Sequence, residues 1–459
     1  MSQNIRQLMQ VRRDKRQFIE DQGLDPYGSD RRKGSHSNSS AVERTGDGYS
    51  SIFRGRVVQL RKMGKSSFAH LQDPYGKFQI YAQRDILGDE GYAVFKKIDI
   101  GDIIEVHGET FTTQSGEKTV RVHAMAFLTK ALRPLPDKHN GVKDVEIKYR
   151  QRYLDLITSP ESRKVFIARS NIVRSIRGLL DELNFMEVET PMLHSIAGGA
   201  SAKPFRTHYN ALNEDVCLRI APELYLKTLL VGGFENVYEI NRNFRNEGLS
   251  VKHNPEFTAL EAYQAYNDYM GMIYLMEKIM HVASSVVNES NESSFNKFER
   301  ISYCDLIKDR LGIEYDDDKF EEIHARYENE IEPTLIEPTF VTRFPYKAMP
   351  PLSKRSEDDR FVEVFEFVMN GQELGCGYSE ENNPDIQRQS FDAQEGETDE
   401  AFLLAMEHGM PPAGGLGLGI DRLVMALTQS SSIKDVILFP QLKRKRFQKK
   451  VNYHKPIRN

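Results

Sequence analysis

Cysteine, long apolar runs and an apolar N-terminal segment are all scarce or missing in this sequence. The three cysteines, Cys217, Cys304 and Cys376, are widely spaced, which argues against a disulfide framework and against a CxxC-type zinc site. No run approaches the roughly 20 apolar residues that a membrane-spanning helix needs. The initial MSQNIRQLMQVRRDKRQF lacks the apolar core of a signal peptide. We therefore expect a cytoplasmic protein in a reducing compartment.

The residues that are present describe a globular chain with unevenly distributed charge. At 459 residues the chain is too long for one compact core, so two or three domains are expected. The formal net charge is -5, yet residues 6–16 hold a basic cluster and no acidic residue follows Gln441. Such basic ends would steer a polyanion to selected surfaces. A solvated tail is an equally open interpretation of the C-terminal stretch.

The N-terminal part is predicted to contain a helix, a linker and a small β-domain. Residues 5–22 show a polar helical pattern with a thin apolar stripe, and Gly23 is placed to end the helix. Residues 34–48 are rich in Ser, Asn and Gly and are typical of a linker. About five short strand-like runs follow between residues 52 and 128, broken by turn signals such as DPYG and QSGE. They fit an antiparallel barrel of the OB type, although a generic β-domain fits the pattern equally.

Beyond the Pro- and charge-rich segment LRPLPDKHNGVKDVE, helical and strand patterns are mixed. Helices are predicted at 161–184 and 269–288, and Asn370-Gly371 is a strong hairpin signal. The mixture predicts an α+β domain on an antiparallel sheet flanked by helices. The predicted parts are residues 1–50 (helix and linker), 51–132 (OB-type barrel), 133–442 (catalytic domain) and 443–459 (basic tail).

The segment VYEINRNFRNEGLSVKHNPEFTALEAYQAY (237–266) is predicted to be two strands joined by a polar loop. Alternation places Glu239, Asn241, Asn243 and Arg245 on one face of the first strand, and Phe257, Ala259, Glu261 and Tyr263 on one face of the second. An aromatic ring and a carboxylate beside an arginine could hold a nucleotide base and a cation. An ordinary amphipathic hairpin with salt bridges on its wet face is the alternative.

A glycine-rich turn suggests an anion site. In GGLGLGIDRLVMAL (414–427), glycines lead directly into a helix with Arg422 in its first turn. Free backbone N–H groups, the helix dipole and a fixed positive charge all favour an anion there. Glycine-rich turns are common, so the stretch is informative only together with its neighbours.

Acidic residues interrupt the apolar hairpin FEFVMNGQELGCGYSEE at Glu366, Glu373 and Glu380. Buried acids are costly unless they are paired or metal-bound, and Glu366 with Glu373 could share Mg²⁺ with phosphate oxygens. Strict alternation puts Glu373 and Glu380 on opposite faces. For both to reach one pocket the strand needs a bulge, and Gly375 or Gly377 is the expected place.

These stretches resemble, in order, the three signatures of class II aminoacyl-tRNA synthetases. NFMEVETPML, with Pro191, resembles the first, which in the family ends a helix–strand unit at a dimer interface. FRNE–loop–HNPEF resembles the second, and GLGLGIDR the third. Within the class, the lysine enzymes are similar over residues 10–443, in stretches such as MGKSSFAHLQD, LRPLPDK, YRQRYLDLI, GGASAKPF, RIAPELYLKTLLVGGFENVYEINRNFRNEG and DVILFPQLK.

The resemblance implies a role for each matching residue. It implies that Arg245 bridges the α-phosphate and the lysine carboxylate, and that Arg245 and Arg422 are the catalytic residues. The implied ATP contacts are Arg245, Glu247, His253, Asn254, Phe257, Gly419 and Arg422. The implied lysine contacts are Gly199, Glu223, Arg245, Glu261, Tyr263, Cys376 and Glu380, and the implied Mg²⁺ ligands are Glu366 and Glu373. In the barrel, Arg61, Phe68, Gln79 and Glu117 resemble anticodon readers.

The sequence departs from the family pattern at three places. Cys376 stands where the lysine enzymes carry an asparagine near the substrate carboxylate, and a thiol is a poor hydrogen-bond donor. SEENNP replaces the commoner SELND, although its first glutamate, Glu380, is kept. The basic tail extends past Leu442, where the family usually ends. None of these departures removes a charge from the expected chemistry.

The function that the resemblance implies is ATP-dependent activation of L-lysine and transfer of the lysyl group to tRNA(Lys) by a homodimer. Two carboxylates in one pocket select a cationic side chain, which disfavours an aspartate or asparagine enzyme. The barrel disfavours an enzyme that lysylates proteins, and three ordered signatures disfavour an unrelated metabolic enzyme. A catalytically inactive paralogue that binds RNA or regulates is the main alternative. It is expected to have lost Arg245, Glu373 or Arg422, and all three are present.

Overall fold

The computed structural model describes residues 3–28, 35–136, 144–200, 202–288, 295–349, 351–393 and 398–443. The chain divides into two compact units, Met1–Gly141 and Val142–Asn459, and each is described by itself. Most of the basic stretch, residues 444–459, lies outside the described residues. Within the described ranges, every helix is too short or too polar to cross a lipid bilayer.

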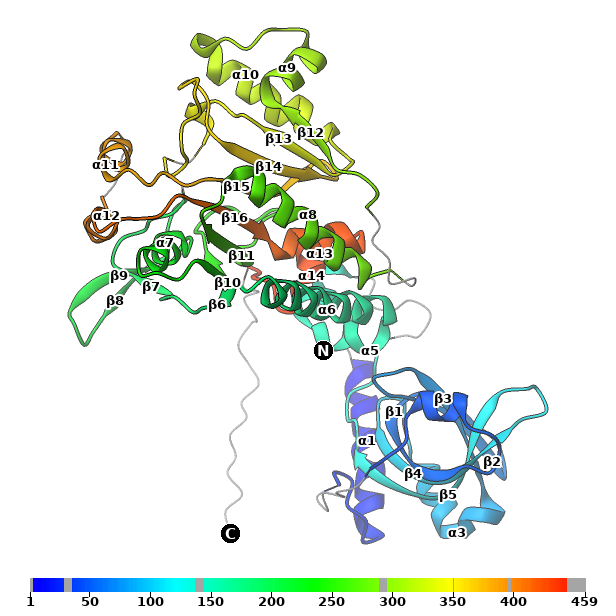
Figure 1. Cartoon of the computed structure of the whole chain (residues 1–459). Coiled ribbons are helices and arrows are strands. Elements are labelled where there is room, and N and C mark those ends of the chain that lie inside the picture. Colours follow the sequence, from blue (N-terminus) through cyan, green and yellow to red (C-terminus); the bar gives the residue numbers. More distant parts are fainter. Residues whose placement is uncertain are drawn as a thin grey trace. The chain divides into compact units, whose positions relative to one another are not determined.

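The first unit is a closed five-stranded barrel with three helices (blue to cyan in Figure 1). The strand order around the barrel is β1-β2-β3-β5-β4. Its elements are α1 (Gln3–Asp21), α2 (Ser39–Arg44), β1 (Ser50–Lys62), β2 (Ser66–Gln72), β3 (Lys77–Gln83), α3 (Arg84–Phe95), β4 (Ile103–Thr112) and β5 (Lys118–Thr129). The generic β-domain is thereby excluded and the OB-type barrel is confirmed.

Alternation of buried and exposed residues along the strands builds the barrel core. Strand β2 alternates between half-buried and buried positions, so that Ala69 and Leu71 enter a core shared with Phe53 and Ile80. The predicted helix α1 ends before Gly23, which has a φ of 71°. The linker prediction for 34–48 is wrong in part, because Asn38 caps the short helix α2 through its side-chain oxygen.

The second unit is an eight-stranded sheet with helices on both faces and a small three-stranded sheet beside it. The helices are α4 (Val145–Arg150), α5 (Arg152–Thr158), α6 (Pro160–Glu182), α7 (Glu223–Val231), α8 (Tyr269–Ser285), α9 (Tyr303–Leu311), α10 (Phe320–Arg326), α11 (Pro384–Asp392), α12 (Glu400–Glu407), α13 (Ile420–Thr428) and α14 (Ile433–Val436). Short helical turns are η1 (Asp317–Lys319), η2 (Tyr327–Ile331), η3 (Glu332–Thr334) and η4 (Tyr346–Ala348). The strands are β6 (Met186–Glu187), β7 (Leu193–His194), β8 (Arg206–Tyr209), β9 (Glu214–Leu218), β10 (Asn236–Phe244), β11 (Glu256–Ala265), β12 (Glu299–Ser302), β13 (Thr339–Thr342), β14 (Val364–Met369), β15 (Gln372–Ser379) and β16 (Ala413–Gly419).

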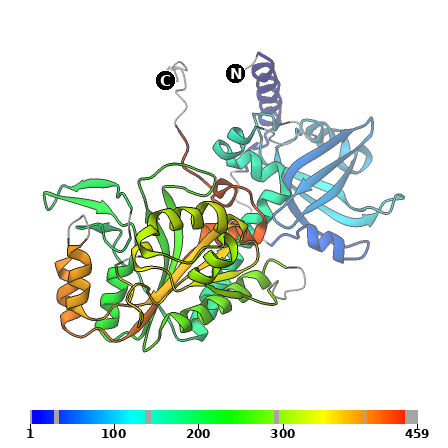
Figure 2. The same ribbon diagram turned by 90° about the horizontal axis from the view of Figure 1, so that it is seen from above.

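The large sheet has the order β12-β13-β14-β15-β16-β11-β10-β6. All its central pairs are antiparallel, as predicted, but the pairs at its two edges, β12 with β13 and β10 with β6, are parallel. Helices α6, α8 and α13 share one hydrophobic core with one face of the sheet, and α7, α9, α10 and α12 share a second core with the other face. Helices α11 and α12 lie side by side (orange in Figure 2).

The predicted bulge is present, one residue before the expected glycines. Strand β15 shifts its register against β14 between the pairs Phe367–Gly375 and Val368–Glu373, which leaves Leu374 as the extra residue. Leu374 is buried in the core on the helix-α8 side. Glu373 therefore comes onto the same face as Cys376 and Tyr378, as the predicted pocket requires.

Candidate active site

A cavity of about 360 Å³ lies over the centre of the large sheet, a volume typical of a site for a small organic ligand. It is lined by one face of β10, β11, β15 and β16, by the loop between β10 and β11, and by the start of α7 and α13. The face is the one turned away from α8. Strands distant in sequence thus supply one surface.

The structure brings together almost all of the catalytic-domain residues that the sequence singled out. The cavity is lined by Gly199, Glu223, Arg245, Glu247, His253, Asn254, Phe257, Glu261, Tyr263, Glu373, Cys376, Gly419 and Arg422. Glu366 and Glu380 are not among the lining residues. Their direct contact with a ligand stays a prediction, and the neighbours that they do contact are described below.

Arginine and phenylalanine meet at the hairpin of β10 and β11. The guanidinium carbon of Arg245 lies 5.1 Å from the centre of the Phe257 ring, a cation–π distance. The loop between the strands is held by Asn254, whose amide donates to the Glu256 carbonyl at 2.6 Å and accepts from the Gln441 backbone N–H at 3.3 Å. Since its amide is occupied in this way, Asn254 orients the loop that carries the predicted ATP contacts.

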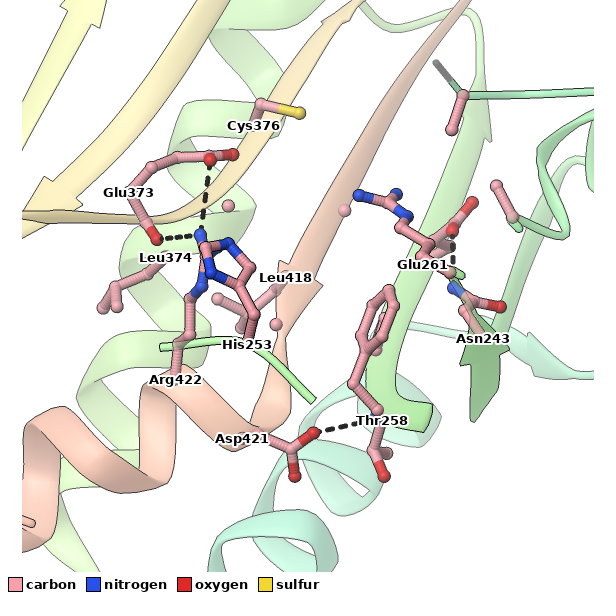
Figure 3. Close-up of a pocket in the computed structure, with 18 of the residues that line it drawn as sticks. Asn243, His253, Thr258, Glu261, Glu373, Leu374, Cys376, Leu418, Asp421 and Arg422 are labelled. Carbon is pink, nitrogen blue, oxygen red and sulfur yellow. Dashed lines mark hydrogen bonds and ion pairs between the residues drawn. The ribbon is translucent and has the colours of Figure 1, made fainter. Parts of the chain in front are cut away.

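Arg422 lines the cavity and contacts two other predicted residues, Glu373 and His253 (Figure 3). Its guanidinium donates to the Glu373 carbonyl at 2.7 Å, to the Glu373 carboxylate at 3.4 Å and to Nε2 of His253 at 3.1 Å. Burial and the charge of Arg422 lower the pKa of His253. The neutral ring then accepts at Nε2, which leaves Nδ1–H to donate to the Ser250 hydroxyl at 2.9 Å.

Asp421 and Arg169 are positioning residues that sequence reasoning missed. The Asp421 carboxylate accepts the Thr258 backbone N–H at 2.8 Å (Figure 3) and pairs with Arg169 at 2.5 Å. Helix α13, whose N-cap Gly419 makes no side-chain cap bond, is thus fixed against the start of β11. Its free N–H groups and Arg422 are directed toward the cavity. The sequence did offer a signal for Asp421, because it directly precedes Arg422 in the glycine-rich turn.

The opposite end of the cavity is acidic. Burial, together with the nearby Glu223 carboxylate, raises the pKa of Glu261 to about 8. Glu261 accepts hydrogen bonds from the Tyr263 hydroxyl at 3.2 Å and from the Asn243 amide at 3.5 Å (Figure 3). A buried carboxylate of raised pKa gains strongly from a cationic partner. This end therefore favours a ligand with an ammonium group.

A lysine that the sequence gave no reason to single out lies behind these acids. Lys227 is fully buried, and its Nζ lies 2.9 Å from Oε1 of Glu223 and forms an ion pair with Glu380. The Tyr378 hydroxyl donates to the same Glu223 oxygen at 2.5 Å. Glu380 is accordingly occupied by an internal cation rather than exposed to the cavity.

The two acids predicted to hold Mg²⁺ lie close together. Burial and the neighbouring Glu373 carboxylate raise the pKa of Glu366 well above its ordinary value. Glu366 accepts a hydrogen bond from the Tyr327 hydroxyl at 3.2 Å, and Glu332 accepts the Glu373 backbone N–H at 3.3 Å. Among the described residues no three His, Cys, Asp or Glu side chains gather as metal ligands. Two adjacent carboxylates suffice for a Mg²⁺ that also binds substrate phosphates.

Cys376 lines the cavity as a neutral thiol. Burial, followed by the carboxylates of Glu373 and Glu366, raises its pKa well above the ordinary value. A protonated thiol is a poor nucleophile, so the residue narrows the cavity without contributing covalent chemistry.

The glycine-rich strand β16 leaves room for the acidic end. A Cβ atom on Gly415 would lie 2.1 Å from a Glu380 carboxylate oxygen and 2.5 Å from the Tyr263 ring. Gly415 pairs with Tyr263 on one side and Tyr378 on the other, and the Tyr263 ring lies over its bare backbone.

The barrel gathers its own predicted residues on one surface. Arg61 pairs with Phe68 across β1 and β2, and the Phe68 ring lies 4.6 Å from that of Tyr81. Gln79 donates to Thr119 at 2.9 Å, and Glu117 contacts His70 at 3.0 Å. Sequence reasoning missed the aromatic row that continues from Tyr81 to Phe111, whose ring centres lie 6.0 Å apart.

Comparison with known families agrees with both units. The family described as tRNA synthetases class II (D, K and N) matches residues 144–443. The family described as OB-fold nucleic acid binding domain matches residues 52–128. The match of the first covers well over half of the chain, and the chain therefore belongs to the class II tRNA synthetases (D, K and N).

Curated relatives narrow the class. A lysine–tRNA ligase of Oceanobacillus iheyensis is 44% identical over 97% of this chain and 100% of its own length. The one from Carboxydothermus hydrogenoformans is 44% identical over 96% of this chain and 99% of its own length, and the one from Bacillus subtilis 43% over 95% and 97%. Within its class the chain thus groups with the lysine–tRNA ligases.

Proposed function

We propose that the protein activates L-lysine with ATP and transfers the lysyl group to tRNA(Lys). The observation that supports this most directly is the polarity of the cavity. Arg422 and His253 lie at the end that suits phosphates, and the buried acids Glu223 and Glu261 lie at the end that suits ammonium groups. Arg245 lies between them, close enough to influence the pKa of both His253 and Glu261. One elongated cavity can therefore align a nucleotide and a cationic amino acid.

In the first step the lysine carboxylate attacks the α-phosphorus and pyrophosphate leaves. The carboxylate is already ionised at neutral pH, so no general base is required. In this proposal Arg245 bridges the carboxylate and the α-phosphate, and Arg422 offsets charge on the outer phosphates. Phe257 offers a face on which adenine can stack. In the second step a terminal ribose hydroxyl of the tRNA takes the lysyl group.

Glu366 and Glu373 are the residues that would hold Mg²⁺. The Glu373 carboxylate is close enough to disfavour ionisation of Glu366, an effect that a divalent cation would relieve. Bound there with the nucleotide, the ion would neutralise charge on the phosphate oxygens. His253 and Arg422 flank the same end of the cavity.

The barrel is proposed to bind the anticodon. Phe68 and the adjoining Tyr81 ring can stack splayed bases, whereas Arg61, Gln79 and Glu117 offer polar groups to base edges. Class II enzymes of this family are expected to act as dimers through the first signature. In that stretch the apolar side chains Met186 and Leu193 are about half exposed, which suits a surface that a second copy covers.

The test is ATP–pyrophosphate exchange with each of the twenty amino acids, supplied one at a time with Mg²⁺. Exchange with lysine alone is expected, because only a cationic side chain suits Glu261. Exchange with another amino acid would show that Glu261 and Glu380 are misassigned. If no amino acid supports exchange, the inactive RNA-binding paralogue becomes the better proposal.

Replacement of Arg245 by alanine tests the catalytic assignment. Since the guanidinium is placed to contact both reacting groups, Arg245→Ala is expected to lower lysine-dependent exchange by roughly 1,000-fold or more. The thermal unfolding temperature should change little, because Arg245 is only half-buried at the end of β10. Arg242→Ala, on the same strand but paired with exposed Glu256, is the matched control. Near-normal exchange by Arg245→Ala would remove the residue from the mechanism.

A further inference from the structure

Lys227 is a buried ammonium group enclosed by carboxylates and rings. Its side chain is fully inaccessible, and its Nζ contacts Glu223 at 2.9 Å and pairs with Glu380. The rings of Tyr378 and Phe402 cover it at 5.7 and 5.9 Å. An ammonium in such surroundings is stable only because carboxylates neutralise it.

The two carboxylates that Lys227 joins come from separate elements and have separate predicted roles. Glu223 begins α7 and is assigned to the α-amino group of lysine. Glu380 follows β15 and is assigned to the ε-ammonium group. Both oxygens lie against one Nζ atom, so that this nitrogen determines how far apart the two acids can be.

The charges around the cavity explain why such a cation is needed. Glu223, Glu261 and Glu380 are all buried. Glu223 raises the pKa of both Glu261 and Glu380, and Glu261 also raises the pKa of Glu380. Without a fixed positive charge, carboxylates this close take up protons and lose their attraction for a cationic ligand. Lys227 lowers the pKa of Glu380 against this tendency.

We propose that Lys227 is a positioning residue that determines substrate specificity: it bridges Glu223 and Glu380 and so sets the spacing at which two ammonium groups of one ligand are recognised. The proposal rests on the proposed function and deepens it, because it names what defines lysine as the substrate. The titratable groups near Lys227 and its partners come from three elements. They are Glu223 of α7, Tyr378 of β15 with Glu380 directly after this strand, and Glu261 and Tyr263 of β11.

The test is Lys227→Met in the full-length protein, measured by ATP–pyrophosphate exchange. The KM for lysine is expected to rise roughly 100-fold, as for loss of a partner in a buried charged network, while the KM for ATP stays within about twofold. The pH below which lysine is no longer used should move upward, because Glu380 loses the cation that favours its ionised form. Discrimination against ornithine, which is one methylene shorter, should fall.

Lys130→Met is the matched control. Lys130 is also a fully buried lysine between two carboxylates, 2.7 Å from both Asp99 and Asp102, but it belongs to the barrel. Its loss should lower thermal stability as Lys227→Met does, and should leave the KM for lysine, the pH profile and the ornithine ratio unchanged. If Lys227 has only a structural role, Lys227→Met and Lys130→Met should show the same KM for lysine, the same pH profile and the same ornithine ratio in the exchange assay.

A double variant keeps the test decisive if Lys227→Met does not fold. Lys227→Met with Glu380→Gln removes the cation together with one carboxylate, which rebalances the buried charge. Loss of ornithine discrimination and a raised KM for lysine are expected again. A wild-type KM and wild-type discrimination in either variant would overturn the proposal. If the wild-type protein itself does not use lysine, the proposed function fails instead.

Discussion

At the scale of single residues, burial of Glu261 makes lysine recognition depend on pH. The free carboxyl has its pKa raised to about 8, and only its ionised form attracts an ammonium group. We therefore expect kcat/KM for lysine to rise with pH through about 8. Glu261→Gln should lower kcat/KM by roughly 100-fold and flatten this limb of the profile. If kcat/KM of the variant still rises with pH through the same range, another group is responsible for the pH dependence.

The same substitution has a consequence for stability. Because the pKa of Glu261 is raised from an ordinary value of 4.5 to about 8, the folded protein binds more protons than the unfolded chain between these values. Stability contributed by this group is therefore lost as the pH rises through that window.

Thermal unfolding in the absence of ligand measures this effect. Well above pH 8, Glu261→Gln should raise stability by on the order of 1 kcal/mol, a shift of roughly 2 °C. Glu239→Gln is the matched control, since Glu239 lies directly opposite Glu261 on β10 but is paired with buried Arg219 at 2.9 Å. That variant should be less stable than wild type, because it leaves Arg219 without its partner.

Residues that point into the cavity could be predicted from the sequence, and the residues behind them could not. Phe257 and Glu261 follow from strand alternation, and Arg422 from the glycine-rich turn. Lys227 and Tyr327 contact Glu380 and Glu366 from elements distant in sequence. No spacing or motif connects such pairs, because tertiary packing alone brings them together.

At the scale of elements, the π-helical turn η2 supports one of the predicted metal ligands. π-helical turns are rare and occur often at functional sites. Here η2 carries Tyr327, whose hydroxyl donates to Glu366, and is followed by η3 with Glu332, which accepts the Glu373 backbone N–H. The segment thus contacts the carboxylate of Glu366 and the backbone of Glu373.

Tyr327→Phe removes only the hydroxyl and should weaken metal binding. Since Glu366 would lose a hydrogen bond to its carboxylate, the Mg²⁺ concentration for half-maximal exchange should rise roughly 10-fold. Direct titration with Mn²⁺ as a paramagnetic probe should show the same loss. Tyr303→Phe is the control, because its hydroxyl contacts His324 at 3.4 Å within the same aromatic cluster. If both variants need the same Mg²⁺ concentration for half-maximal exchange, this role for Tyr327 is excluded.

The bulge of β15 shows what a pattern can and cannot predict at this scale. The need for an extra residue followed from placing Glu373 and Glu380 in one pocket. Its position at Leu374, rather than at Gly375 or Gly377, follows from packing, because Leu374 fills the core beneath the strand. The parallel pairs at the two edges of the sheet could not be predicted either. Alternation of residues indicates which side chains share a face of a strand, but it does not indicate the direction of the strand.

At the scale of the whole molecule, the barrel and the second unit have separate hydrophobic cores, and we propose that they carry out separate tasks. The barrel core and the two cores of the second unit share no residues. The two compact units meet at residues 141 and 142. The match to the OB-fold family lies before this point and the match to the synthetase family lies after it. The barrel surface is therefore expected to affect tRNA use without affecting adenylate formation.

Phe68→Ala tests this separation. Loss of one stacking ring should lower kcat/KM for tRNA charging roughly 10- to 100-fold, whereas lysine-dependent exchange should stay at the wild-type rate. Tyr75→Ala is the control, since Tyr75 is an aromatic residue of the same barrel that is 71% exposed in a turn. Equal damage to exchange and charging would show that the barrel is not a separate anticodon module.

The bare backbone at Gly415 has a consequence for how such a pocket can evolve. Any side chain there would occupy space already taken by Glu380 and Tyr263, so no single substitution at this position can be tolerated while both neighbours stay in place. A side chain at Gly415 therefore requires a change at Glu380 or Tyr263 first, so that the glycine and the acidic end of the cavity can change only together.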